Sequence, residues 1–252
     1  MGATLTMVTA EDDVAGLESN LCINCHQGRS STPTVDRQLS DLPGDEVSDR
    51  IRFSNIHYFA AGATLFGNDA QGAYQFADKE YLGRNEHVNR FDSCVECHDT
   101  HALEVVVTEC ADCHENVQTQ ADLVNIRDED NSTDYDGDGD VTEGMAGEIA
   151  TMSEALYAAM QTYSASTPGT LPILYDSHAY PYFFADADGN GEVNGEEGGY
   201  NTWTPNLLRA AYNYQYVQKD PGAFAHNGKY VLQFLYDSIQ AVGGDTTGMT
   251  RP

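Results

Sequence analysis

All six cysteines of the 252-residue chain belong to one repeated pattern, two cysteines three positions apart followed directly by a histidine. Two thiols at this spacing reach both vinyl groups of one haem, and the adjacent imidazole turns beneath the ring to bind iron. The sequence therefore predicts three covalently attached c-type haems, held by Cys22, Cys25 and His26, by Cys94, Cys97 and His98, and by Cys110, Cys113 and His114.

Other uses of paired cysteines explain this pattern less well. A structural zinc site takes two pairs as four ligands, so three pairs leave one stranded and give the following histidine no role. A thioredoxin-like motif occurs once, beside a βαβ unit, and a disulfide framework does not repeat this motif. Because c-type haem is attached outside the cytoplasm, we expect an exported protein of the periplasm, cell surface or extracellular space. Residues 1–13 lack the features of a secretory signal, so a mature product or a piece of a longer chain is expected.

Five further histidines are available for the three distal axial positions, which permits two imidazoles on every iron. His57 lies in an aromatic stretch, whereas His87 and His101 lie close in sequence to haem motifs, and a short tether points such a side chain at a neighbouring haem. These three are the first candidates. His226 follows them, with helix capping as its alternative, and His178 comes last. The helically spaced methionines near residues 145–160 are expected to pack in the core.

Two acidic loops resemble the calcium loop of EF-hands, in which oxygen ligands alternate along the chain and a glycine permits a sharp turn. The second loop fits the whole pattern, with Asp186, Asp188, Asn190, Glu192, Asn194 and Glu197 as predicted ligands. The first loop fits through position nine, with Asp134, Asp136, Asp138, Asp140 and Thr142 as predicted ligands. At its twelfth position stands Met145, so Glu143 or Glu148 would have to substitute. We expect two structural calcium ions, against the alternative of metal-free acidic turns.

The chain has 40 acidic and 12 basic residues, a net charge of −28. A surface this negative repels nucleic acid and anionic lipid. It suits a salty habitat, where screening weakens self-repulsion, or the binding of divalent cations or a basic partner. No apolar run is long enough to span a bilayer, so membrane insertion is not expected.

The predicted fold is mainly α with much irregular loop. Residues 1–120 are expected to form a trihaem cytochrome c region whose loops wrap haem. Residues 121–252 are expected to form a helical region with the two calcium loops. Apolar spacing and capping residues predict helices after the first loop, from residue 205 to about 217, and over residues 227–242.

The chain resembles multihaem c-type cytochromes of extracellular electron transfer, some of which polymerise into nanowires. Besides the haem motifs, the resemblance rests on residues 54–64, 97–105 and 219–227. It implies iron ligation by His101 and His226, redox partner proteins or extracellular acceptors, an electron carrier in place of an enzyme, and a possible homo-polymer. Three haems are few for this family. The alternatives are a multihaem reductase with one open haem and, less favoured, a calcium-dependent adhesive subunit.

Overall fold

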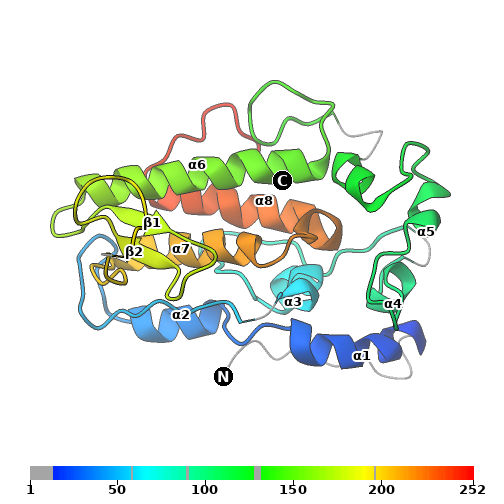
Figure 1. Ribbon diagram of the computed structural model, residues 1–252, viewed down its shortest axis with the longest axis horizontal. Helices are drawn as coiled ribbons and strands as arrows, with labels where there is room; N and C mark the ends of the chain where they lie inside the picture. Colours follow the sequence, from blue (N-terminus) through cyan, green and yellow to red (C-terminus); the bar gives the residue numbers. More distant parts are fainter. Residues whose placement is uncertain (1–13, 58, 89–90, 128–131, 196) are drawn as a thin grey trace.

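The computed structural model describes residues 14–57, 59–88, 91–127, 132–195 and 197–252. The expectation about residues 1–13 lies outside this range. Three long helices stack against one another and form the body of the molecule (Figure 1). They are α6 (Met145–Ser166), α7 (Pro205–Gln218) and α8 (Ala223–Ala241). All three correspond to helices predicted from the sequence.

Each long helix forms for a reason visible in its sequence. In α6, apolar side chains recur every three or four residues and are buried along one face, among them Ile149, Met152, Leu156 and Met160. In α7, the Thr204 side chain caps the helix by accepting a hydrogen bond from the Leu207 N–H, and a proline occupies the first position. The methionines of α6 therefore pack in the core, as predicted.

The remaining elements are shorter than these three. They are α1 (Val14–His26), α2 (Thr32–Leu39), α3 (Ala61–Phe66), η1 (Gly67–Asp69), α4 (Cys94–Cys97), α5 (Val107–Ala111), η2 (Gln120–Asn125), β1 (Ile173–Tyr175) and β2 (Phe183–Ala185). The two strands pair antiparallel, with Ile173 opposite Ala185. The prediction of a mainly helical fold with much irregular loop is confirmed. The small hairpin was not predicted from the sequence.

One buried cluster takes side chains from both parts of the chain, including Ile23 and Val35 from the first and Trp203 and Tyr212 from the second. Buried side-chain amides of α7 and α8 also accept hydrogen bonds from backbone N–H groups at three positions on either side of α3 and η1. Gln215 accepts a hydrogen bond from the Ile56 N–H, and other such bonds reach Tyr74 and Leu82. Side chains of α7 and α8 therefore bind the backbone of segments from the first half of the chain. The predicted boundary between two regions near residue 120 stays a prediction.

Within the described residues, no helix combines the length and the apolar character that crossing a bilayer requires.

Candidate haem sites and acidic loops

The three elements that carry the cysteine motifs lie at the same end of the molecule (Figure 1). The first motif occupies the last turns of α1, the second forms the single turn of α4, and the third begins in α5. A capping box between Ser93 and Glu96 holds the short α4 helix. The Cys94 N–H donates to the Ser19 hydroxyl over 3.1 Å, which joins α4 to α1. The fold thus brings the first motif, distant in sequence, against the second.

The thiols of successive motifs are neighbours. Cys22 lies beside Cys94, and Cys110 lies close enough to Cys97 to raise the pKa of its thiol. Burial, together with the negative charge of Cys110 and Glu96, raises the pKa of Cys97 to about 11. In the described part of the chain, no three cysteine or histidine ligand atoms lie within 4.8 Å of one another. The cysteine motifs thus lie next to one another, the first beside the second and the second beside the third.

His226 faces His98, the histidine of the second cysteine motif. The ring centroids of His98 and His226 are 6.5 Å apart, with their planes inclined by 34°. The other side of the His226 ring is fixed, because Nδ1 lies 2.9 and 3.0 Å from the two carboxylate oxygens of Asp220, which is 2% exposed. This hydrogen bond leaves Nε2 as the nitrogen that can bind a metal.

Burial and nearby groups shift the pKa values of both His226 and His98. Burial lowers the pKa of His226, but the charge and hydrogen bond of Asp220 outweigh burial, so the net pKa is raised. The pKa of His98 is lowered, first by burial and then by the nearby His226 and His26. Sequence reasoning missed Asp220, although an acidic residue six positions before a candidate histidine is visible in the sequence.

His87 stands in the same relation to the third motif. Its ring centroid lies 6.4 Å from that of His114, at an interplanar angle of 58°. An imidazole nitrogen lies about 2 Å from a metal that it binds, so two rings on opposite sides of one iron have centroids roughly 6 Å apart. Both observed separations match this spacing. The donor set of the second and third motifs therefore fits a haem with two histidine ligands.

The remaining candidate ligands are placed differently. His26 has its Nδ1 fixed at 2.8 Å from the Phe59 carbonyl, which leaves Nε2 for a metal. His57 and His101 are exposed, and His101 Nδ1 lies 3.2 Å from the Thr100 hydroxyl. The ligand roles of both histidines stay predictions. His178 is 92% exposed and lies beside Asp176.

Carboxylates converge in the first acidic loop. Oxygens of Asp134, Asp136 and Asp138 lie within 4.8 Å of one another, and so do oxygens of Asp136, Glu143 and Glu148. Burial, then the charges of Asp136 and Glu148, raise the pKa of Glu143 to about 7. Asp140 instead caps Thr142, since its Oδ1 accepts from both the N–H and the hydroxyl of that residue. Of the five predicted ligands, the structure thus brings three aspartates together.

The second acidic loop has the predicted turn but an open arrangement. Gly191 adopts a φ of 77°, and the N–H groups of Gly189 and Gly191 donate to the Asp186 carboxylate. The carboxylates of Asp188 and Glu197 accept from the N–H groups of Asn190 and Asn194. Among the described residues, no three carboxylates of this loop lie within 4.8 Å. Its six predicted ligands stay a prediction.

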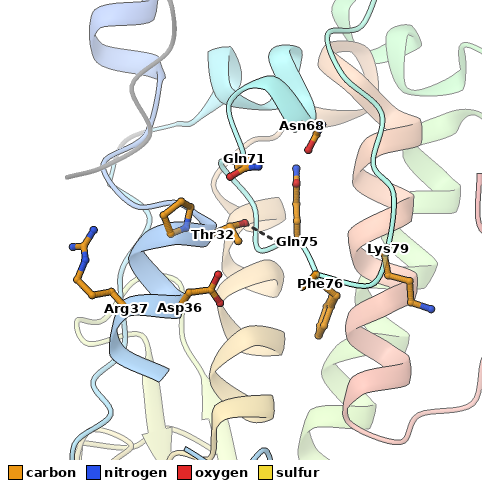
Figure 2. Close-up of a pocket in the computed structure, with 10 residues that line it drawn as sticks. Thr32, Asp36, Arg37, Asn68, Gln71, Gln75, Phe76 and Lys79 are labelled. Carbon is orange, nitrogen blue, oxygen red and sulfur yellow. Dashed lines mark hydrogen bonds between the residues drawn. The ribbon is translucent and has the colours of Figure 1, made fainter. Parts of the chain in front are cut away.

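A polar hollow lies between α2 and the segment 68–79 (Figure 2). Thr32 closes one wall: its hydroxyl donates to the Ala73 carbonyl and accepts from the Gln75 N–H. Asp36, Arg37 and Lys79 give the lining charges of both signs, and the lining contains neither histidine nor cysteine. The hollow therefore contributes no ligand to the haem sites.

Comparison with known proteins gives one consistent result. The chain is 29% identical over 272 aligned residues to the C-type polyheme cytochrome OmcB of two Geobacter sulfurreducens strains, an alignment that covers 96% of this chain and 33% of OmcB. It is 27% identical to the C-type polyheme cytochrome OmcC, over 94% of this chain and 31% of OmcC. No family model and no solved structure matches the chain.

This chain thus spans about one third of the length of the curated relatives that it matches. The expected resemblance is confirmed: over nearly its whole length, the chain is similar to polyhaem c-type cytochromes.

Proposed function

We propose that this protein is an electron carrier with three c-type haems, one at each Cys-x-x-Cys-His motif. In two of them, His98 pairs with His226 and His114 pairs with His87 as axial ligands. The separation of these ring pairs, 6.5 and 6.4 Å, is the observation that carries the proposal. The similarity to polyhaem cytochromes supports the same cofactor.

The chemistry supplied by a bound haem is the uptake of one electron as ferric iron becomes ferrous, and its release in the reverse step. The residues of this chain decide which use is made of it. A histidine on each face leaves no coordination position for a substrate, which favours electron transfer over catalysis. Motifs whose thiols are neighbours keep the three centres close together, so that an electron can pass from one to the next.

The first motif receives its distal ligand from His57 or His101 in this proposal. The other of these two histidines would serve a haem of a second copy, as a filament requires. Attachment of c-type haem outside the cytoplasm places the carrier in the periplasm, at the cell surface or in the extracellular space. Its partners would be redox proteins or extracellular acceptors.

Electron paramagnetic resonance of the ferric, haem-loaded protein tests the proposal. We expect low-spin signals from all three haems, because two imidazoles impose a strong ligand field. We also expect no reduction of nitrite or hydroxylamine by the reduced protein. A high-spin signal from one haem, together with turnover of either compound, would identify a reductase with an open site in place of an electron carrier.

A further inference from the structure

The first acidic loop contains a buried carboxylate oxygen without a partner. Asp136 is 5% exposed, and its Oδ1 accepts a hydrogen bond from the Asp138 N–H. Its Oδ2 is buried and makes no hydrogen bond. A buried, unpaired carboxylate oxygen is costly, and such groups are normally paired or bound to a metal. The Oε1 atom of Glu143, close to Asp136, is buried and unpartnered as well.

The distances around Asp136 suit a single hard cation. Calcium binds oxygens at about 2.3–2.6 Å, so two oxygens on one ion are at most about 5 Å apart. The oxygens of Asp134, Asp136 and Asp138 meet this condition, and so do those of Asp136 and Glu143. Asp136 belongs to both groups and therefore links the aspartates of the loop to the glutamate that precedes α6.

Glu148 and Arg127, next to this cluster, are bound to each other. Glu148 is fully buried and already engaged: Oε1 lies 2.6 Å from the Arg127 guanidinium, and Oε2 accepts from the N–H groups of Tyr135 and Asp136. It holds the loop backbone in place. One guanidinium cannot neutralise all the clustered carboxylates, and a cation bound among them would relieve the repulsion that remains.

The structure also explains why a methionine replaces the usual last ligand. Met145 points toward α8, where a Cβ added to Gly228 would lie 2.4 Å from its Cγ. The twelfth position of the loop is thus used to pack α6 on α8. Glu143 lies instead over the first turn of α6, with its carboxylate directly against Gly147.

We propose that the first acidic loop binds one calcium ion through Asp134, Asp136, Asp138 and Glu143, with Glu143 replacing the carboxylate normally found at position twelve. Glu148 and Arg127 support these ligands from behind. The proposal does not depend on the haem assignment, because none of these residues belongs to a haem motif.

Calorimetric titration of the chelator-treated, haem-loaded protein with CaCl₂ tests this site. Because the second loop is a predicted calcium site too, we use the Glu197→Gln background throughout. We expect one calcium site in this background and at least tenfold weaker binding after Glu143→Gln. Glu154→Gln, the same change at an exposed position of α6, is the matched control and should bind as the background does.

Thermal unfolding of Asp136→Asn gives an independent result. Without calcium, this variant should melt above the background protein, because one of the mutually repelling buried carboxylates becomes neutral. With saturating calcium the order should reverse, since the variant loses a ligand. Absence of calcium binding in the background protein, equal affinity after Glu143→Gln, or the same melting order with and without calcium would each overturn the proposal.

Discussion

Replacing His226 with alanine is expected to convert one of the three haems from low-spin to high-spin and to leave the other two unchanged. The His226 ring lies 6.5 Å from that of His98, the separation of two imidazoles on one iron, so its removal opens one axial position. Electron paramagnetic resonance and the high-spin charge-transfer absorption band measure the change. Added imidazole should restore the low-spin signal.

His178→Ala is the matched control, because His178 is 92% exposed and should leave all three haems low-spin. Three low-spin haems in His226→Ala would contradict the pairing with His98. Loss of the low-spin signal in His178→Ala would show that sixth ligands are assigned wrongly.

Asp220→Asn tests whether Asp220 sets the reduction potential of the same haem while His226 remains its ligand. The buried carboxylate accepts a hydrogen bond from His226 Nδ1, which makes the ring a stronger donor and favours ferric iron. Asparagine can keep a hydrogen bond but carries no charge. We expect a low-spin haem whose reduction potential rises by about 60 mV, which corresponds to a tenfold change for a one-electron couple. Potentiometric titration that shows three unchanged potentials would exclude this role.

Asn213→Leu is expected to cause a large loss of stability without changing any candidate haem ligand. The fully buried Asn213 side chain accepts from the Tyr74 N–H and donates to the Tyr74 carbonyl and the Ser238 hydroxyl. Leucine leaves both backbone groups of Tyr74 buried and unpaired, at about 1–3 kcal/mol each. We therefore expect the free energy of unfolding to fall by about 3 kcal/mol, measured by guanidinium denaturation of the oxidised protein.

Asn201→Leu is the control, because it makes the same chemical change at an exposed position. Its effect should stay within about 0.5 kcal/mol. If Asn213→Leu lowered the free energy of unfolding by less than about 1 kcal/mol, the bonds from α7 to the Tyr74 backbone would not stabilise the fold as described.

The sequence predicts local features of this protein, such as the long helices, because the patterns that indicate them are short. Thiol spacing within five residues defines each haem motif, and apolar spacing together with caps such as Thr204-Pro205 defines the long helices. The pairing of histidines is different in kind. His98 and His226 lie about half of the chain apart in sequence, and the packing of α3, α6 and α7 on α8 brings His226 to the end of the molecule that carries the cysteine motifs.

The acidic loops show a similar limit. The second loop has the complete ligand pattern, yet carboxylates converge only in the first among the described residues. The reason lies in the tertiary structure, because α6 follows the first loop directly. Glu143, just before α6, and Glu148, in its first turn, therefore lie against Asp136. The packing of Met145 against Gly228, which displaces the usual last ligand, has no signal in the loop sequence.

Intact mass of the mature polypeptide, combined with its iron content, tests the central claim most directly. The account predicts a mass increase of three haems per chain that survives denaturation and acid extraction, and three irons per polypeptide, because six cysteines form thioether bonds. A chain that is isolated from an expression host able to attach haem c, and yet carries six unmodified thiols, would contradict it.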